Sequence, residues 1–360
     1  MKLKKISEQV VVITGASSGI GLITARKMAQ KGAKLVLAAR SGQALEQLVA
    51  EITAEGGEAV AVTADVGRED DVRNISKVAQ ERFGGFDTWV NNAGISIIGR
   101  IEETPMEDNH RLFDTNFWGI VYGSLEAIKV LKSRGGALIN LGSVVSERVA
   151  HPQGMYSTSK FAVKGFTDAL RMELEEDSSP ISVTLIQPSA MDTPFSLNAK
   201  NFTGKEFQLP PPVYSPDLVA DAILHVAENP KRDIVIGGGG KILSKTEQFM
   251  PGLTDKVMES RAFTELQKKD SPASEHEHAL YRPSERLLER GNYDGHVMKR
   301  SLYTTAALHP AATAVAAFTL GLGLMGLVRA RQQTRLVPEQ YRLPASTPES
   351  RRELAGITTS

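Results

Sequence analysis

The chain has 360 residues, of which 41% are apolar, so we expect one large α/β domain with an appendage. The 42 basic and 42 acidic side chains balance. Because a neutral chain has no field that attracts a polyanion, no nucleic-acid partner is expected. The absence of cysteine excludes disulfide bonds, a thiolate nucleophile and cysteine-ligated metal sites. The early apolar run Val10–Ile13 is too short for a signal peptide, which predicts a cytoplasmic catalytic part.

Short β-branched runs alternate with helix-period segments up to about residue 240. This alternation is typical of repeated βα units that build a parallel sheet, and runs that are apolar throughout indicate strands covered on both faces. We predict a doubly wound, Rossmann-type α/β sheet with strands at 10–14, 35–39, 59–63, 88–91, 137–141, 181–187 and 234–236. The predicted helices between them include 20–30, 44–54, 70–82, 157–176 and 216–228.

The composition changes after residue 240, where a charged segment is interrupted by prolines. Residues 311–328 then carry no charge, and the last stretch is polar. The predicted domains are a catalytic domain (1–245), a helical or irregular extension (246–305), an apolar helix (306–330) and a disordered tail (331–360). The apolar stretch 311–328 predicts membrane association, and the alternative is a helix buried in a subunit interface.

A glycine-rich turn, Thr14-Gly15-Ala16-Ser17-Ser18-Gly19-Ile20-Gly21, follows the first predicted strand and opens the first predicted helix. Glycines let the backbone approach a pyrophosphate, whose charge the helix N-terminus attracts. The alternative is an ordinary strand-to-helix turn, but the position in a βαβ unit favours dinucleotide binding. The predicted cofactor residues of this turn are Gly15, Ser17, Ser18, Gly19, Ile20 and Gly21. A similar pattern at 321–326 lies in no βαβ unit and is not expected to bind a cofactor.

The second predicted strand ends in Ala39 and Arg40, without the acidic residue that binds the adenosine ribose hydroxyls of NAD. An arginine favours the 2′-phosphate of NADP, so we predict NADP(H) over NAD(H). The alternative is that Arg40 is a solvated surface charge. Asp65 follows the third strand and is a candidate acceptor for the adenine amino group. Candidates for the cofactor floor, after the fourth strand, are Asn92, Ala93 and Gly94.

Side chains suited to proton transfer follow the strand at 137–141, at the sheet edge where open α/β sheets bind ligands. Ser143 comes first, and Tyr156 and Lys160 are four residues apart at the start of a predicted helix. Both project from one helix face, where the ammonium is expected to lower the Tyr156 pKa for acid–base catalysis. Two surface side chains are the alternative, and the position beside Ser143 favours the catalytic pair. Histidines at 276 and 278 point apart on a helix, so no metal site is expected.

In chain order, these residues resemble the short-chain dehydrogenases/reductases in their ordinary single-domain form, over about residues 7–240. The resemblance rests on the glycine turn, Asn91-Asn92-Ala93-Gly94, Asn116 within Thr115-Asn116-Phe117-Trp118-Gly119, Ser143, and Tyr156-x-x-x-Lys160. It implies that Tyr156 is the general acid and base and that Ser143 orients the substrate oxygen. It also implies that Lys160 binds the nicotinamide ribose, that Asn116 holds a water for proton relay, and that the protein is a homo-oligomer.

One departure from the family is Ser189, which stands where a glycine usually follows Pro188. Pro188 and Thr193 keep the family pattern and are predicted to contact the cofactor. The next segment, 194–214, is rich in Phe, Leu and Pro. Either it lines a pocket for an apolar carbonyl or alcohol substrate, or its side chains only pack against the domain.

Two classes of function remain open. The favoured class is an NADP(H)-dependent oxidoreductase that transfers a hydride between the nicotinamide and a carbonyl or alcohol substrate. The other is a dinucleotide-sensing or scaffold protein on the same fold, because a fold does not imply an activity. The presence of Asn116, Ser143, Tyr156 and Lys160 together favours the enzyme.

Overall fold

The computed structural model describes residues 2–239, 268–272 and 278–310, and the single positions 252, 256, 260, 313, 314 and 325. Contacts divide the chain into two units, Met1–Leu308 and His309–Ser360. The first unit contains the sheet and the predicted catalytic residues. Residues 276 and 277 and most of 311–328 lie outside the described residues.

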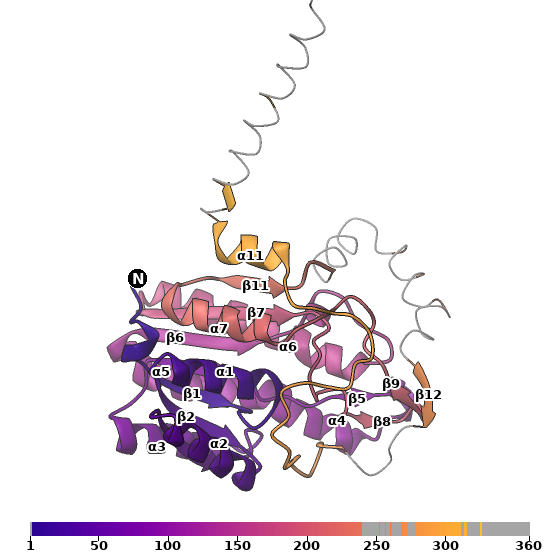
Figure 1. The fold of residues 1–360 in the computed structure, drawn as a ribbon, viewed down its shortest axis with the longest axis horizontal. Coiled ribbons are helices and arrows are strands. Elements are labelled where there is room, and N and C mark those ends of the chain that lie inside the picture. Colours follow the sequence, from indigo (N-terminus) through magenta and orange to yellow (C-terminus); the bar gives the residue numbers. More distant parts are fainter. Residues whose placement is uncertain are drawn as a thin grey trace, which may run out of the picture. The chain divides into compact units, whose positions relative to one another are not determined.

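A parallel sheet of seven strands forms the centre of the first unit, in the order β11-β7-β6-β4-β1-β2-β3 (Figure 1). Its neighbouring strands all pair in parallel, which confirms the predicted doubly wound Rossmann-type sheet. The strands are β1 (Val10–Thr14), β2 (Lys34–Ala39), β3 (Glu58–Thr63), β4 (Thr88–Asn91), β6 (Gly136–Leu141), β7 (Ile181–Pro188) and β11 (Asp233–Ile236).

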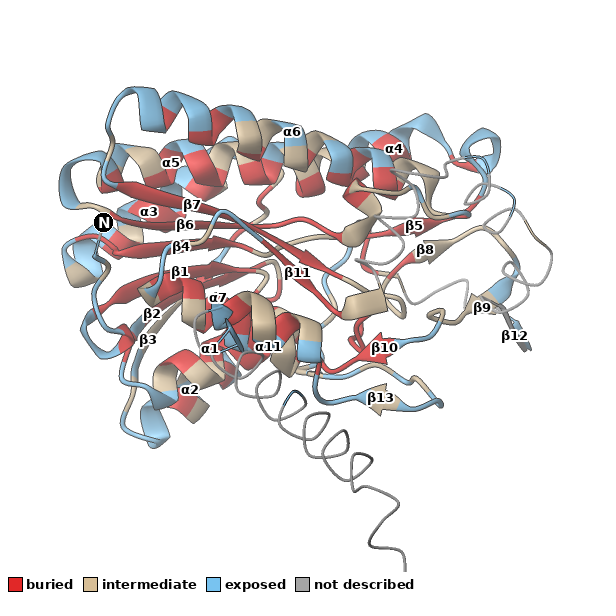
Figure 2. Ribbon diagram, turned by 90° about the horizontal axis from the view of Figure 1, so that it is seen from above, coloured by how far each residue is buried: buried red, intermediate tan, exposed pale blue. Residues whose placement is uncertain are grey.

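Two layers of helices cover the sheet, one on each face (Figure 2). One face carries α1 (Gly19–Gln30), α2 (Gly42–Ala54) and α7 (Asp217–Glu228), and the other α3 (Glu69–Phe83), α5 (Gly119–Arg134) and α6 (Gly154–Glu176). Leu22, Leu48 and Ile223 are buried in the first layer, and Ile75 and Leu131 in the second. The alternation of strand and helix in the sequence therefore produces two separate apolar cores, one on each side of the sheet.

Short strands pair beyond the carboxyl ends of the sheet strands, on the side to which the β arrows point (Figure 2). The pairs are β5 (Ile97–Ile98) with β8 (Lys200–Asn201), β9 (Lys205–Phe207) with β12 (Lys268–Pro272), and β10 (Val213–Tyr214) with β13 (Val297–Met298). Two further helices are α4 (Met106–Phe113), which contacts α6, and α11 (Leu302–Leu308), which packs against β11 and α7. These pairings bring segments after residue 190 to the edge of the sheet where the site is predicted.

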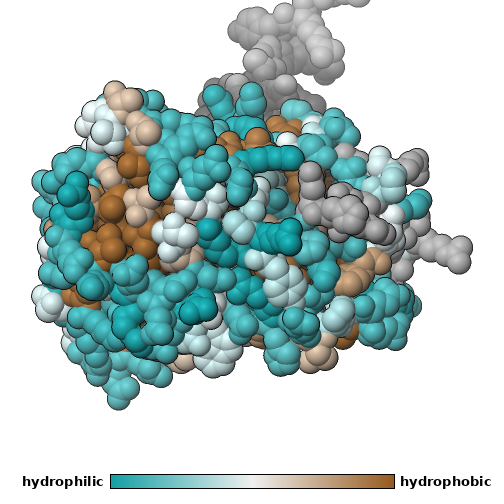
Figure 3. All heavy atoms as spheres, turned by 90° about the horizontal axis from the view of Figure 1, so that it is seen from below, coloured by the Kyte–Doolittle hydropathy of each residue, from teal (hydrophilic) through white to brown (hydrophobic). Residues whose placement is uncertain are grey.

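β3 is the last strand of the sheet, and no strand of the described residues pairs with its outer edge. Figure 3 shows the molecule from this side, where most of the surface is hydrophilic and one apolar area is open to solvent. Ala59, Val60 and Ala61 of β3 are half-buried. The hydrophilic helices α2 and α3 flank this edge and limit the apolar surface that is exposed.

None of the helices in the described part of the chain has the length and apolar character that a bilayer crossing requires. Because most of 311–328 is not among these residues, the membrane association of that stretch stays a prediction. The same is true of the predicted domain boundaries. Residues 278–305 of the predicted extension, and 306–308 of the predicted apolar helix, belong to the same unit as the sheet.

Candidate active site

The topology places a crevice where β1 and β4 lie side by side. From β1 the chain continues outward to β2 and β3, and from β4 it continues in the other direction to β6 and β7. The connections at such a switch point leave the sheet on opposite faces, so a crevice opens at the carboxyl ends of the two strands. A cavity of about 510 Å³ lies here, which is within the usual range for small-molecule sites.

Most of the residues predicted to form the site line this one cavity. They come from the ends of six strands and from the start of α6, although they are spread over 179 positions of the chain, from 15 to 193. The cavity-lining residues are Gly15, Ser17, Ser18, Gly19, Ile20, Arg40, Asp65, Asn92, Ala93, Gly94, Ser143, Tyr156, Lys160, Pro188 and Thr193. The other two predicted residues, Gly21 and Asn116, do not line the cavity, and both are buried.

The glycine turn has the geometry that an anion site requires. Gly15 and Gly19 have φ values of +67° and +53°, a region that L side chains rarely adopt. A Cβ on Gly21 would lie 2.2 Å from the Gly15 carbonyl oxygen, so only glycine fits there. Ser18 is the N-cap of α1, and the residues at this helix N-terminus face the cavity. These residues fit a bound pyrophosphate, because the N-terminus of a helix attracts anions.

The cofactor-floor loop is held against the glycine turn by Thr14, at the end of β1. The Thr14 hydroxyl oxygen accepts hydrogen bonds from the backbone amides of Asn92 (3.1 Å) and Ala93 (3.2 Å). The Asn92 side chain donates in return to the Thr14 carbonyl at 2.9 Å. The ends of β1 and β4 are therefore fixed to each other at the centre of the crevice.

Ser143, Tyr156 and Lys160 lie together at the inner end of the cavity. The Ser143 side chain is close enough to Tyr156 to act on its pKa, and its hydroxyl donates to the Pro188 carbonyl at 3.5 Å and accepts from the Val145 amide at 3.2 Å. The Lys160 ammonium donates to the Leu141 carbonyl at 2.9 Å and lies 5.9 Å from the centre of the Tyr156 ring. The i, i+4 spacing on α6 thus brings both side chains to the end of β6, beside Ser143.

Burial controls the ionisation of both groups. Loss of solvent raises the pKa of Tyr156, and this effect exceeds the lowering by the Ser143 side chain. Burial also lowers the pKa of Lys160 to about 8. The prediction that the neighbouring ammonium lowers the Tyr156 pKa is therefore wrong for this structure, because desolvation of a buried phenolate outweighs an ammonium that is itself desolvated.

Asn116 lies in an unusual segment, a π-helical turn (Asp114–Trp118) between α4 and α5. Its side chain accepts from the Ile95 amide at 2.8 Å, and donates to the Ile95 carbonyl at 2.9 Å and to the Ser159 hydroxyl at 3.2 Å. Ser159 in turn donates to the Tyr156 carbonyl at 2.7 Å. Asn116 thus connects the cofactor-floor loop to the helix that carries Tyr156. Single-turn π-helices inside α-helices often occur at functional sites.

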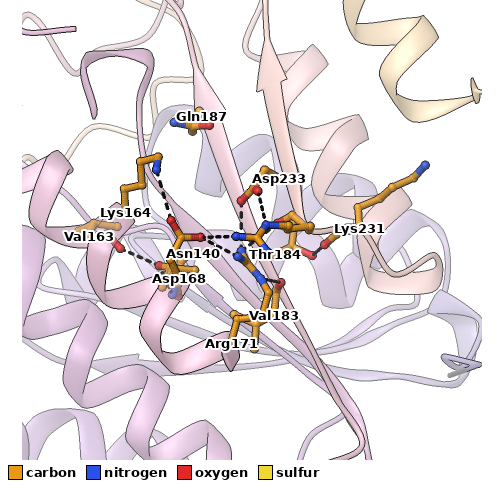
Figure 4. A network of polar contacts seen from close by, with 12 residues as sticks. Asn140, Val163, Lys164, Asp168, Arg171, Val183, Thr184, Gln187, Lys231 and Asp233 are labelled. Carbon is orange, nitrogen blue, oxygen red and sulfur yellow. Dashed lines mark hydrogen bonds and ion pairs between the residues drawn. The ribbon is translucent and has the colours of Figure 1, made fainter. Parts of the chain in front are cut away.

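A second polar network holds α6 against the sheet (Figure 4). Arg171, with 5% of its side chain exposed, forms ion pairs with Asp168 (2.7 Å) and Asp233 (3.1 Å). It also donates to the Val183 carbonyl at 3.2 Å. Because these contacts reach β7 and β11, they fix the position of the helix from which Tyr156 and Lys160 project.

Arg40 lines the cavity, but its guanidinium is in contact with a distant part of the chain. It donates to the carbonyl oxygens of Ala279 and of Leu280, the latter at 3.0 Å. Burial lowers the pKa of Arg40, and the nearby guanidinium of Arg111 adds to this effect. Asp65 is paired with Arg111 at 2.5 Å. The part of the cavity near Arg40 is thus bordered by charged groups that have protein partners.

The other end of the cavity is apolar. Phe195, Phe207 and Leu209, from the segment after Thr193, line it. The Phe195 ring lies 5.4 Å from the Tyr156 ring, between centres. Apolar side chains therefore surround the position next to the Tyr156 hydroxyl.

Among the cavity residues that sequence reasoning missed are Ala279, Pro283 and Ser284, which lie far beyond the Rossmann-type sheet in the sequence. They belong to an irregular segment, and Pro283 was read only as an interruption of helical periodicity. No local pattern could identify them, because their place depends on hydrogen bonds to residues more than 200 positions away.

Comparison with known proteins gives the family. The short chain dehydrogenase family model matches residues 9–203. The "Uncharacterized oxidoreductase YxnA" of Bacillus subtilis is 45% identical over 317 residues, which cover 87% of this chain and 89% of that protein. The "Dehydrogenase/reductase SDR family member 7B" of Bos taurus is 32% identical over 278 residues, covering 74% of this chain and 85% of that protein.

Solved structures agree with the sequence relatives. A short-chain type dehydrogenase/reductase from Mycobacterium marinum has a TM-score of 0.58 at 28% identity, covering 66% of this chain and 96% of its own. An alcohol dehydrogenase from the archaeon Thermococcus sibiricus, complexed with 5-hydroxy-NADP, has a TM-score of 0.57 at 29% identity, covering 63% of this chain and 95% of its own. The chain belongs to the short-chain dehydrogenase/reductase family and is an NAD(P)-dependent oxidoreductase.

Proposed function

We propose that the protein interconverts an apolar carbonyl compound and its alcohol with NADP(H), and that Tyr156 moves the proton. The observation that carries this proposal is that the side chains of Ser143, Tyr156 and Lys160 line one cavity together with apolar residues. A carbonyl oxygen that accepts from both hydroxyls would point its substituents toward Phe195, Phe207 and Leu209. Ser143 would orient and polarise this oxygen, and Tyr156 would donate to it.

Tyr156 is in the protonated form that a proton donor needs. The phenol is neutral at pH 7 and would give its proton to an oxygen that becomes negative during reduction, although its raised pKa makes it a weaker acid than a phenol in water. When bound, the nicotinamide supplies the hydride. Lys160, beside the Tyr156 ring, would bind the nicotinamide ribose and stabilise the phenolate that is left after the transfer.

Asn116 has a supporting part in this proposal. Its contacts with Ile95 and Ser159 keep the cofactor-floor loop and α6 in a fixed relation. A water that it holds would return a proton to Tyr156. Thr193 and Pro188 would contact the cofactor from the end of β7, since both line the cavity.

The choice of NADP rests on Arg40. The residue follows β2 and lines the cavity together with Ser17 and Ser41. None of these three side chains is negatively charged, so none of them would repel a 2′-phosphate. A guanidinium that donates to two carbonyl oxygens has the geometry to donate to phosphate oxygens instead. The solved alcohol dehydrogenase with 5-hydroxy-NADP supports this choice.

Replacement of the phenol tests the proposal. Tyr156→Phe should lower kcat for the reduction of apolar aldehydes and ketones by roughly 100-fold or more, because a positioned general acid contributes at least that factor. NADPH affinity should stay within a few-fold, since the ring remains. The measurements are NADPH absorbance with a panel of carbonyl compounds and a fluorescence titration of NADPH.

Tyr122→Phe on α5 is the matched control, because Tyr122 does not line the cavity, and it should leave kcat unchanged. If Tyr156→Phe keeps more than a tenth of the unmodified kcat on the best substrate, Tyr156 is not the proton donor.

A further inference from the structure

Residues 278–291, which we call the strap, cross the open side of the dinucleotide crevice. Ala279, Pro283 and Ser284 line the cavity, and Arg40 donates to the carbonyl oxygens of Ala279 and Leu280. In Figure 1 the strap is part of the orange segment that precedes α11 in the chain. It therefore forms a wall at the end of the cavity that the glycine turn and Arg40 assign to adenosine.

The inner part of the strap is attached to the cavity by arginines and by one apolar side chain. Arg40 donates to Ala279 and Leu280, and the Arg111 Nε donates to the same Leu280 carbonyl at 3.2 Å. The Leu280 side chain has no exposed surface and belongs to the apolar cluster that contains Tyr156. A segment in random surface contact would not bury a leucine next to the proposed proton donor.

Further contacts anchor the strap outside the cavity. The Tyr281 hydroxyl donates to Asp108 of α4 at 2.8 Å. The amide of Gly19, at the start of α1, donates to the Leu288 carbonyl at 2.8 Å. Glu289 pairs with Arg26 at 2.7 Å, and Arg290 pairs with Asp217 at 2.5 Å.

The last residue of the strap, Gly291, lies close to the loop that follows β7. A Cβ on Gly291 would lie 2.6 Å from the Thr193 carbonyl oxygen, so the backbone at this position approaches more closely than any side chain allows. The strap is thus held at both ends and in the middle, by groups from α1, α4, α7 and the loop after β7.

The strap lies outside the part of the chain that the family model describes. That model ends at residue 203. The two solved relatives match nearly all of their own length but only 63% and 66% of this chain, whereas the Bacillus protein matches 317 of the 360 residues. A match of that length has to include residues 278–291.

We propose that the strap is the outer wall of the adenosine half of the cofactor site, and that its anchors retain the bound dinucleotide. This proposal rests on the placement of the dinucleotide in the crevice that is proposed above. Because the strap closes the side from which adenosine would enter, the cofactor is exchanged when the strap opens locally. Weaker anchors then raise the rates of cofactor release and of cofactor binding together, so Kd changes less than either rate.

The rate of cofactor release tests the anchors. Tyr281→Phe removes the hydrogen bond to Asp108, and Arg290→Ala removes the contacts with Asp217 and Ser215; neither residue lines the cavity. Each should raise the rate of NADPH release, measured by stopped-flow displacement, by roughly 5-fold, and the double variant should raise it further. Tyr122→Phe is the control and should leave the rate unchanged. If the strap only stabilises the fold, the two variants will lower the melting temperature and leave the rate of NADPH release unchanged, which would overturn the proposal.

Thiol labelling tests the wall directly, since the chain has no cysteine of its own. The thiol introduced by Ser284→Cys should react with a maleimide in the free protein and be protected roughly 10-fold or more by saturating NADPH, because bound adenosine would cover it. The thiol introduced by Arg282→Cys is the control. Arg282 is exposed and does not line the cavity, so its labelling should not depend on NADPH.

The outcomes separate the two proposals. If NADPH and NADH both fail to bind the unmodified protein, the proposed function and the strap proposal are both overturned. If either cofactor binds, but the labelling of Ser284→Cys and the release rates of the anchor variants do not change, only the strap proposal is overturned.

Discussion

Arg40 has two sets of acceptors within reach, the strap carbonyls and the phosphate that it is proposed to bind. Its guanidinium is buried enough that its pKa is lowered, and it would not remain in this position without hydrogen-bond acceptors. The Ala279 and Leu280 carbonyl oxygens supply them. A phosphate with two negative charges is a stronger acceptor than a carbonyl, so Arg40 would exchange one for the other at small cost.

The preference for NADP tests this view of Arg40. Arg40→Ala should lower NADPH affinity by roughly 10- to 100-fold and leave NADH affinity within a few-fold, because only NADPH has the phosphate. Fluorescence titrations of both cofactors measure this. Arg82→Ala, an exposed arginine of α3, is the control that changes the same charge away from the cavity. Tighter binding of NADH than of NADPH by the unmodified protein would contradict the NADP proposal outright.

At the scale of elements, α6 determines how the site is built. Its first turns carry Tyr156 and Lys160, and its later turns carry Asp168 and Arg171, which are fixed to β7 and β11. The Asn140 side chain of β6 also donates to Thr167 of this helix at 3.0 Å. A helix attached to the sheet over this length holds its N-terminal turns in one orientation.

Arg171 is therefore expected to contribute to stability. Arg171→Met should lower the free energy of unfolding by about 2–3 kcal/mol, because it removes the buried partner of Asp168 and Asp233 and the donor to the Val183 carbonyl. Urea denaturation measures the difference. The control is Arg232→Met, since Arg232 pairs with the same two aspartates but has 62% of its side chain exposed, and it should cost less than about 1 kcal/mol. Equal losses for the two variants would show that burial does not set the contribution of Arg171.

The elements of the sheet could be predicted from the sequence, because each strand is a short apolar run and each crossover helix has a local period. The strands expected at 10–14 and 88–91 match β1 and β4 to the residue, and the other five strands differ by one residue at an end. The π-helical turn around Asn116 could not be predicted, since the Asn116 side chain accepts from the Ile95 amide and donates to the Ser159 hydroxyl, which are 21 and 43 positions away in the sequence. The strap was missed for the same reason.

At the residue scale of the site, the motifs identified the cavity residues from 15 to 193, but not the ionisation of Tyr156. Spacing along a helix shows that two side chains are neighbours, whereas a pKa depends on how much solvent both have lost. That quantity follows from the packing of α6, the loop after β7 and the strap, none of which is visible in Tyr-x-x-x-Lys itself. Homo-oligomer formation likewise stays a prediction, because the described residues belong to one chain.

Across the whole molecule, the buried Lys160 links stability to pH. Its pKa falls from 10.5 in the unfolded chain to about 8 in the fold. Between these values the unfolded chain binds a proton that the folded chain does not, so the free energy of unfolding rises with pH in this range. Relative to Lys160→Met, the unmodified protein should gain up to roughly 3 kcal/mol between pH 7 and 10.

Urea denaturation of both proteins at several pH values between 7 and 10 gives this difference, and groups other than Lys160 cancel because both proteins contain them. A difference that stays constant over this range would mean that Lys160 keeps its ordinary pKa in the fold.

The long reach of the strap also bears on the order in which the chain folds. Its contacts with Arg26 and Arg40 join residues separated by 263 and 240 positions, so they can form only after the sheet and both helical layers are in place. During synthesis the N-terminal segments leave the ribosome first, and the sheet strands are complete before the strap is made. Docking of the strap is then a late step of assembly, and a nascent chain acquires its complete Rossmann-type core well before it acquires the outer wall of its cofactor site.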